Sequence, residues 1–229
     1  MNETEVAAAV SWLNSATNSG LREDILNQLE GATNSALQSP LMQLALSDAD
    51  EDVRGQAVDN LGRFAADPQV EAMLWNILSK DQSDSVREEA ANALARLPVT
   101  DARRVALEKL ALDPNASLDT RLVALQALQR ANAGTPDTLA AVAQVAHASE
   151  NPAERARWFD AFDGINDPVL KTPLVHGLQD PNPEVRERAA DALSTFRSDP
   201  AVLEWLQYIA KNDVDPQVRR EALRAMGNR

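Results

Sequence analysis

Few residues in this sequence are of types that do covalent chemistry or hold a metal ion. The chain has two histidines and no cysteine, which removes disulfides, thiol nucleophiles and Cys-ligated metal centres. His147 and His176 are far apart in the sequence and neither is followed by Glu, so the His-Glu pairs of a di-iron site are missing. No Gly-rich phosphate loop, Gly-x-Ser-x-Gly elbow or nucleotide fingerprint is present. The sequence therefore predicts a protein that is not an enzyme and has no metal and no cofactor.

The charge balance excludes some partners. The 229 residues include 22 Lys and Arg against 35 Asp and Glu, a net charge of −13, which repels phosphate backbones at long range. We therefore expect no nucleic-acid partner. No stretch approaches the roughly 18 apolar residues of a membrane span, and the first residues lack a signal-peptide pattern, so we expect no membrane contact by this segment. This fits a soluble protein of the cytoplasm or a periplasmic domain of a longer protein, and leaves the compartment and the oligomeric state open.

A repeat of about 33 residues organises the whole chain. Three segments, which start at Asp48, Asp81 and Asp180, nearly superimpose, and a fourth starts at Asp213. In each of the four an arginine stands six residues after the Asp, and weaker copies lie around Arg22, Arg121 and Arg155. The arginine column has seven members: Arg22, Arg54, Arg87, Arg121, Arg155, Arg186 and Arg219. The chain therefore contains about seven units.

Each unit is predicted to be a helical hairpin. Apolar residues stand three, four and seven positions after each arginine, as Ala57, Val58 and Leu61 do after Arg54, and this spacing predicts an amphipathic helix, here named the B helix. An earlier helix, the A helix, is signalled by pairs such as Asp67-Pro68, which place an N-cap residue before proline. Because one hairpin cannot bury its own apolar stripe, we expect neighbouring hairpins to stack into a solenoid.

The pattern Asp-x-x-x-x-Val-Arg-x-x-Ala-x-x-Ala-Leu resembles the bacterial HEAT repeat, especially the subtype of phycobilisome-lyase-like proteins. The resemblance covers all seven units and implies an all-α fold, an α-solenoid with a right-handed superhelix in one domain, 1–229. The expected repeats are 3–31, 35–65, 68–98, 101–132, 136–165, 168–197 and 200–229. It also implies a hydrogen-bonded ladder between repeats, made here by Asp48, Arg54, Asp81, Arg87, Arg121, Arg155, Asp180, Arg186, Asp213 and Arg219.

Exposed columns of the B helices are the candidate partner-binding residues. Helical angles place them opposite the apolar stripe, and the resemblance implies that they line a concave surface. They are Gln56, Asp59, Arg63, Glu89, Asn92, Arg96, Gln126, Arg130, Arg157, Trp158, Asp160, Arg188 and Asp191. One interpretation is a polar groove with a basic row at Arg63, Arg96 and Arg130 that holds a peptide. The other is a solvated face in which Asp59 and Arg63 form an ordinary i,i+4 pair.

The middle of the array departs most from the pattern. Trp158 stands in a column of small residues and joins Phe159 and Phe162 in the one aromatic cluster of the sequence, which favours either core packing or a binding hot spot. The connection 132–134 is the loosest, and Pro173 is expected inside an A helix. We therefore expect local flexibility or binding in the fourth to sixth repeats.

The function predicted from these features is a non-catalytic scaffold that binds a protein or peptide partner. A solenoid offers a large, rigid surface without a closed pocket. One alternative is a chromophore-lyase-like or chaperone subunit of a larger complex, which the repeat subtype suggests. A less favoured alternative is a HEAT-like DNA glycosylase, suggested by Trp158 beside Asp160 and Asp163, although the acidic charge opposes it.

Overall fold

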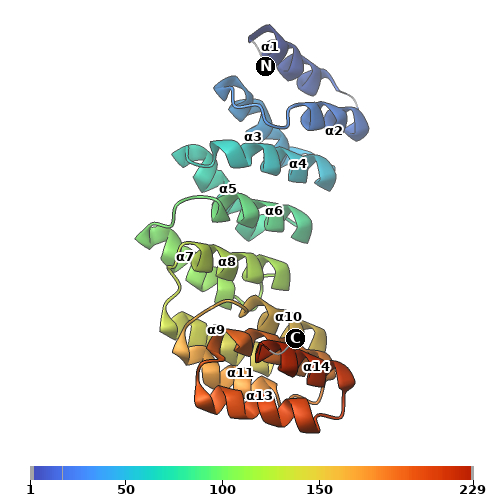
Figure 1. Ribbon diagram of the computed structural model, residues 1–229. Coiled ribbons are helices and arrows are strands. Elements are labelled where there is room, and N and C mark those ends of the chain that lie inside the picture. The colour runs from blue at the N-terminus through green and yellow to red at the C-terminus, as the bar shows by residue number, and fades with distance from the viewer. Residues whose placement is uncertain (1–2, 17, 228–229) are drawn as a thin grey trace. The chain divides into compact units, whose positions relative to one another are not determined.

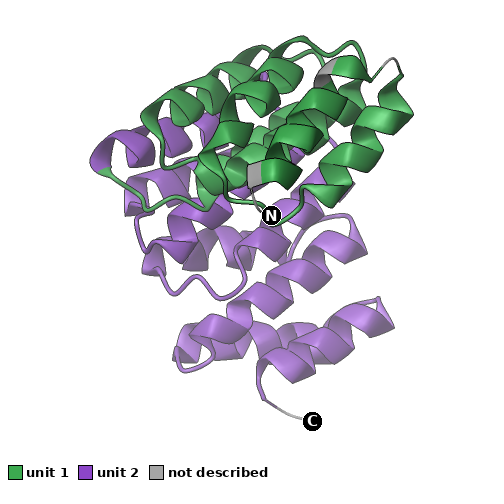
Figure 2. Cartoon of the chain, turned by 90° about the horizontal axis from the view of Figure 1, so that it is seen from above, with its two compact units in different colours: residues 1–100 green, residues 101–229 purple. Residues whose placement is uncertain are grey.

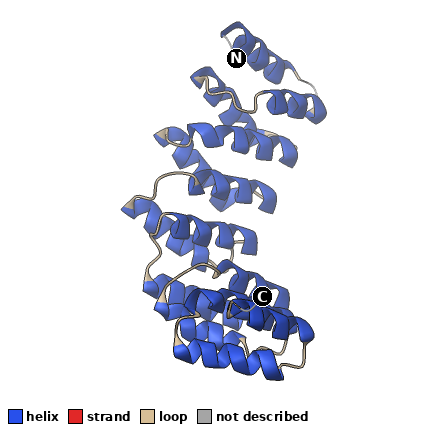
Figure 3. Cartoon of the chain, viewed as in Figure 1, coloured by secondary structure: helices blue, strands red, loops and turns tan. Residues whose placement is uncertain are grey.

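The computed structural model describes residues 3–16 and 18–227, and within them it contains helices and loops but no strand (Figures 1 and 3). The chain divides into two compact units, unit 1 at Met1–Thr100 and unit 2 at Asp101–Arg229 (Figure 2). The predicted all-α fold of stacked hairpins is confirmed. The single domain 1–229 stays a prediction, and its ends, 1–2 and 228–229, lie outside the described residues.

Unit 1 consists of three hairpins, each made of an A helix and a B helix. The A helices are α1 (Glu3–Ser15), α3 (Gln38–Ser47) and α5 (Pro68–Lys80), and the B helices are α2 (Ser19–Gln28), α4 (Glu51–Leu61) and α6 (Asp84–Ala95). A short 3-10 turn, η1 (Ser35–Leu37), leads into α3, and another, η2 (Gly62–Phe64), follows α4. α4 packs on both α2 and α6, while α3 packs on α1 and α5. B helices therefore stack on B helices, and A helices stack on A helices.

Unit 2 consists of four hairpins with the same stacking. Its A helices are α7 (Asp101–Leu112), α9 (Pro136–Ala148), α11 (Lys171–Gly177) and α13 (Pro200–Asn212), and its B helices are α8 (Leu118–Arg130), α10 (Pro152–Ala161), α12 (Pro183–Ala192) and α14 (Pro216–Ala225). The 3-10 turns η3 (Pro168–Leu170) and η4 (Leu193–Phe196) precede α11 and follow α12. α10 packs on α8 and α12, and α12 packs on α14.

The local sequence signals act as predicted. Asp67, Asp199 and Asp215 each accept a backbone N–H with the side chain at a helix start, with proline next in the chain. The first four N–H groups of a helix have no partner within the helix. The proline has no N–H group, and the side chain of the capping Asp accepts a hydrogen bond from another of the four, so two of them need no further partner. The stripe residues Ala57, Val58 and Leu61 are fully buried. Apolar burial between stacked B helices therefore holds the hairpins together.

Pro173 does not interrupt a helix. The sequence placed it inside the sixth A helix, but α11 begins at Lys171, after the turn η3, and Pro173 is its third residue. Backbone N–H groups in the first turn of a helix have no intrahelical partner, so proline loses no hydrogen bond there. Pro173 thus lies in the sixth A helix as expected, but the expected loss of a backbone hydrogen bond was wrong because the helix starts later than the sequence suggested.

Gly177, the last residue of α11, allows a close approach of α11 to α10 and α12. A Cβ atom at this buried glycine would lie 2.5 Å from Phe159 Cε1 and 2.8 Å from Ala189 Cβ. We expect Gly177→Ala to lower the free energy of unfolding by about 1–3 kcal/mol through overpacking, measured by urea denaturation followed by circular dichroism.

Gly55 offers the matched control for that substitution. It lies inside α4, and its added Cβ would meet only Val86 Cγ2, at 4.0 Å. Gly55→Ala should raise stability by about 0.5–1 kcal/mol, because alanine is the better helix former. Equal midpoints for the Gly177→Ala chain and the parent chain would contradict the close approach.

Candidate partner-binding site

The candidate residues lie on the B helices or directly after them, as predicted from their spacing. In unit 1 they are Gln56 and Asp59 on α4, Arg63 in η2, and Glu89, Asn92 and Arg96 on or capping α6. In unit 2 they are Gln126 and Arg130 on α8, Arg157, Trp158 and Asp160 on α10, and Arg188 and Asp191 on α12. All are exposed or half-buried apart from Trp158. Their role in binding stays a prediction.

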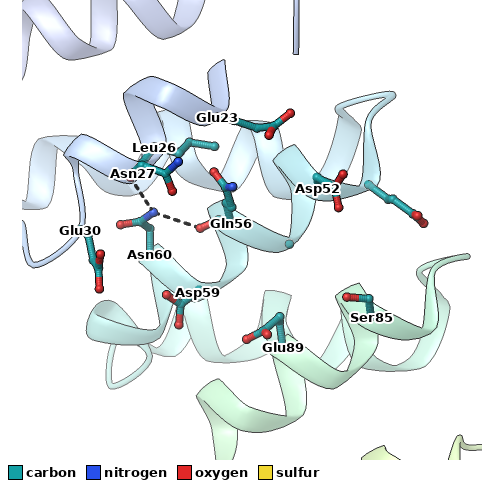
Figure 4. Close-up of a pocket in the computed structure, with 12 residues that line it drawn as sticks. Glu23, Leu26, Asn27, Glu30, Asp52, Gln56, Asp59, Asn60, Ser85 and Glu89 are labelled. Atoms are coloured by element: carbon teal, nitrogen blue, oxygen red, sulfur yellow. Dashed lines mark hydrogen bonds between the residues drawn. The ribbon is translucent and has the colours of Figure 1, made fainter. Parts of the chain in front are cut away.

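A groove crosses the B helices of unit 1. It has a volume of about 400 Å³ and runs over three successive helices, α2, α4 and α6 (Figure 4). Its lining consists of Glu23, Leu26, Asn27, Glu30, Glu51, Asp52, Gly55, Gln56, Asp59, Asn60, Ser85 and Glu89. Six of these side chains are carboxylates and none is Lys or Arg. This lining favours cationic ligands.

The floor of the groove is polar and ordered. Asn60, which is 6% exposed, donates from Nδ2 to the backbone oxygens of Leu26, at 3.2 Å, and Gln56, at 3.0 Å (Figure 4). The side-chain oxygen Oε1 of Gln56 is buried and has no hydrogen-bond partner. A buried acceptor without a donor is unfavourable.

Like charges affect the titration of this groove. Burial raises the pKa of the Glu89 carboxyl, and the carboxylates of Asp59 and Glu88 raise it further against a smaller opposing effect of Arg96. A bound cation would favour the charged form of Glu89 and lower its pKa. A cation in the groove would therefore be held more tightly as the pH rises through the pKa of this group.

The expected basic row pairs with its own neighbours. Arg96 lies 3.5 Å from Asp59 across two repeats, and Arg63 donates to Asn60 Oδ1 at 2.9 Å. The expected i,i+4 pair between Asp59 and Arg63 is therefore replaced by these two contacts. Neither arginine lines the groove, and Arg130 belongs to unit 2, where its Nε donates to the Gln126 carbonyl at 3.3 Å.

In unit 2 the same columns carry ion pairs from one B helix to the next. Arg157 on α10 pairs with Asp119 on α8, and Arg188 on α12 lies 3.2 Å from Asp160 on α10. Burial raises the pKa of Asp191, and Glu221 and Asp163 add to the effect. This face is a mixture of both charges, unlike the groove of unit 1.

The arginine column joins successive repeats through two sets of hydrogen bonds. Nε and Nη2 of the arginine donate to both carboxylate oxygens of the Asp in the following repeat, while Nη1 donates to a backbone oxygen in its own repeat. The pairs are Arg54 with Asp81 (2.9 and 3.0 Å), Arg155 with Asp180 (2.8 and 2.9 Å) and Arg186 with Asp213 (2.8 and 2.9 Å). Arg22 and Asp48 form a further pair. The geometry is bidentate and charge-assisted.

The aspartates of the ladder have lowered pKa values. For Asp213, burial alone would raise the pKa, but the hydrogen bonds from Arg186 and from the backbone of Asp215, with the charge of Arg186, outweigh it. Asp81 and Asp180 have the same balance of causes. A carboxyl whose pKa is lower in the folded state stabilises the fold above its unfolded pKa and loses that contribution as the pH falls through the folded value. The ladder therefore weakens below about pH 4.

Arg87 and Arg121 depart from this pattern. Arg87 pairs with the exposed Asp84 on its own helix and donates to the Asp81 carbonyl at 2.5 Å. Arg121 donates to the Ala111 carbonyl at 3.2 Å, and its guanidinium lies over the Trp158 ring, 5.0 Å from the centroid. Burial lowers the pKa of Arg121. A cation–π contact thus occupies the place of the carboxylate pair.

Trp158 belongs to the core and not to the binding surface. It is 1% exposed, and Phe159 and Phe162 beside it are fully buried. The expectation that Trp158 lines the partner-binding face is therefore corrected: its bulk fills the seam between repeats and supports Arg121. The same burial removes the surface aromatic residue on which the glycosylase alternative depended.

The two histidines meet in space, which their positions in the sequence did not indicate. The rings of His147 on α9 and His176 on α11 lie 6.2 Å apart, and His147 Nε2 is 3.0 Å from the Pro173 carbonyl oxygen. Stacking of A helices brings them together. Within residues 3–16 and 18–227, no group of three or more His, Cys, Asp or Glu side chains could hold a metal ion.

Sequence reasoning missed most of the groove. The columns it followed include Gln56, Asp59 and Glu89, but not the first-turn residues Glu51, Asp52 and Ser85. The acidic run 48–52 was the available signal. Its charge was assigned to helix capping, and only the stacking of α2, α4 and α6 shows that it opens on the same groove.

Comparison with known families gives a decisive match. The family model of HEAT repeats matches residues 38–129 and 139–227, more than three quarters of the chain. The chain belongs to the HEAT-repeat family. No curated protein matches this sequence at a significant level. In the described part of this HEAT-repeat protein, no helix is both long and apolar enough to cross a membrane.

Solved structures of similar fold have little sequence identity to this HEAT-repeat protein. Kap121p bound to Ste12p matches with a TM-score of 0.62 and 16% identity, over 98% of this chain and 27% of Kap121p. YibA of E. coli matches with a TM-score of 0.60 and 20% identity, over 91% of this chain and 75% of YibA. The CpcE and CpcF complex of phycocyanin lyase from Nostoc sp. PCC7120 matches with a TM-score of 0.50 and 18% identity, over 97% of this chain and 93% of the matched chain. These likenesses show the fold.

Proposed function

We propose that this HEAT-repeat protein is a non-catalytic scaffold that binds an extended, positively charged segment of another protein along the B-helix face of unit 1. The observation that carries the proposal is the groove across α2, α4 and α6, in which six carboxylates and no cation line about 400 Å³. A partner with Lys or Arg side chains relieves the repulsion among these carboxylates.

The shape and polarity of the groove favour a polypeptide over a small molecule. The groove lies across three helices and is open to solvent along its length, whereas small-molecule sites are concave and mainly apolar. An extended segment brings backbone N–H donors as well as charged side chains, and these donors can bond the carboxylates that line the groove. The fold is also compatible with this role, since the similar Kap121p has been solved bound to another protein, Ste12p.

Binding of a charged probe peptide tests the proposal. The probe is a fluorescein-labelled peptide of 15 residues in which Lys and Arg alternate with Gly and Ser, and the comparison peptide carries Glu in place of each cation. We expect the basic peptide to bind and the acidic one not to bind. The double variant Glu23→Gln, Glu89→Gln should weaken binding about tenfold, or about 1.4 kcal/mol, in fluorescence anisotropy at about 0.1 M salt.

A variant of equal charge change separates the groove from the general acidity of the chain. Glu150→Gln, Glu204→Gln removes two exposed carboxylates that do not line the groove and should leave the affinity within about twofold, because about 0.1 M salt screens exposed charges that a ligand does not contact. Equal weakening by the two double variants would refute a specific groove and leave only non-specific attraction.

A lyase-like or chaperone role is a second candidate, supported by the similar fold of the CpcE and CpcF complex. It predicts that the purified protein retains a bound tetrapyrrole or increases the yield of a partner's chromophore adduct. Absorbance of the purified protein in the visible range tests this directly, and a colourless protein without effect on such an adduct would exclude it.

A further inference from the structure

A second pocket lies in unit 2, beside the loops that follow α8 and α10. It has a volume of about 390 Å³, at the lower end of the range for ligand pockets. Its lining consists of Leu125, Leu128, Gln129, Asn132, Gly134, Leu139, Asp163, Gly164, Ile165, Asn166 and Asp167. None of these residues belongs to the groove of unit 1 or to the candidate columns of the B helices.

Two left-handed turns create this hollow. After α8, Asn132 has φ 49°, and the N–H groups of Asn132 and Ala133 donate to the carbonyls of Gln129 and Leu128, at 2.9 and 2.8 Å. This pair of hydrogen bonds caps the C-terminal end of α8. After α10, Gly164 has φ 73°. Gly134 adds no side chain in front of Leu128, so the space between the two loops stays open.

The pocket combines an apolar floor with an acidic rim. Leu125 and Leu128 are fully buried and Leu139 is 3% exposed, so they form the floor. Asp163 is exposed at the rim and Asp167 is half-buried there, and no Lys or Arg lines the pocket. Asp167 also caps η3, through Oδ1 and the N–H of Val169, at 3.0 Å. Asp163 is therefore the rim carboxylate that can be changed without loss of a cap.

We propose that this pocket binds one lysine or arginine side chain of a partner polypeptide. The methylene stem of such a residue covers the leucine floor, while its charged end reaches the carboxylates of Asp163 and Asp167. A purely apolar side chain would remove water from both carboxylates without replacing it by a donor, which is unfavourable. The exposed amides of Asn132 and Asn166 at the rim can hydrogen-bond the backbone beside that residue.

This pocket extends the proposed function to a second anchoring point, and its test does not depend on the groove. The probes are the methylamides of Nα-acetyl-lysine and Nα-acetyl-arginine, with Nα-acetyl-norleucine methylamide as the apolar analogue that keeps the four-carbon side chain of lysine and lacks its ammonium group. Methyl resonances of Leu125, Leu128, Leu139 and Ile165 are followed by NMR during titration of the whole chain. We expect saturable shifts at millimolar concentrations of the cationic probes, and about tenfold weaker binding of norleucine, which lacks the charge-assisted bonds.

Three variants define the outcome. Asp163→Asn should lower the affinity for the lysine probe about fivefold. Glu150→Gln, an equal charge change at a residue that does not line the pocket, should leave this affinity unchanged. Gly134→Val should abolish the shifts, because its Cβ meets only Leu128 Cβ, at 4.0 Å, and its methyl groups fill the space. Norleucine binding as tightly as lysine would overturn the cationic occupant. Absence of saturable shifts, or binding unchanged by Asp163→Asn and Gly134→Val, would overturn the pocket itself.

Discussion

Trp158→Ala should lower the free energy of unfolding by about 3–5 kcal/mol, as large-to-small substitutions of buried aromatic residues do. The indole is 1% exposed and fills the seam on α10, and it also supports the Arg121 guanidinium at 5.0 Å. Its removal leaves a cavity and takes the ring from a partly buried cation. Urea denaturation of the whole chain, followed by circular dichroism and by hydrogen exchange of α8 and α10 amides, measures the effect.

Trp205 provides the control, because it is the same residue type on α13 but 36% exposed. Trp205→Ala should cost less than about 1.5 kcal/mol, since its ring leaves water only in part. If the two substitutions shift the denaturation midpoint equally, Trp158 does not have the packing role that its burial indicates. A Trp158→Ala chain of unchanged stability but weaker partner binding would support the binding hot spot instead.

Arg186→Ala should lower the free energy of unfolding by about 2–4 kcal/mol, because removal of one partner leaves a partly buried carboxylate without its counter-charge. The Arg186 side chain is 11% exposed and that of Asp213 is 5% exposed. The substitution also leaves the backbone oxygens of Asp180 and Pro181 without their donor. Chemical denaturation at pH 7 provides the measurement.

Arg188→Ala, on the same helix, is the matched control. Its pair with Asp160 is solvent-exposed, with side chains 41% and 61% exposed, and such pairs contribute about 0–1 kcal/mol. The difference between the two variants should shrink below about pH 4, since protonation of Asp213 removes the charge that Arg186 neutralises. A difference that stays constant down to pH 2 would show that Arg186 stabilises the fold by packing alone.

Much of the fold could be read from the sequence because it depends on local signals. Asp67-Pro68 and Asp215-Pro216 start helices wherever a cap precedes proline, and the columns at Ala57 and Leu61 are buried because helical spacing alone decides which face meets the neighbour. The start of α11 was missed, since Pro173 is acceptable both at a kink and in a first turn, and only the preceding 3-10 turn decides between them.

The candidate sites depend on contacts between repeats, which spacing does not reveal. Arg96 pairs with Asp59 of the preceding repeat, while Arg63 donates to Asn60 within its own repeat. The groove forms only where the first turns of α4 and α6 lie beside α2. The pocket of unit 2 forms between two loops that are about 30 residues apart in the sequence. Trp158 could be identified as unusual, but its burial depends on how far the neighbouring helices move apart.

Each ladder arginine forms hydrogen bonds both within its own repeat and to the next repeat, and this arrangement affects how the number of repeats can change. Arg155 donates to the Ser149 carbonyl in its own repeat and to the Asp180 carboxylate in the next repeat. Asp180 also accepts a hydrogen bond from the N–H of Asn182 in its own loop. A repeat such as this one thus carries one donor for its successor and one acceptor for its predecessor, which the repeats of Arg87 and Arg121 do not both have. Duplication or deletion of a whole repeat of this kind restores its junctions without a compensating substitution, so gene-level gain and loss of such units is far less disruptive than any change of phase within one.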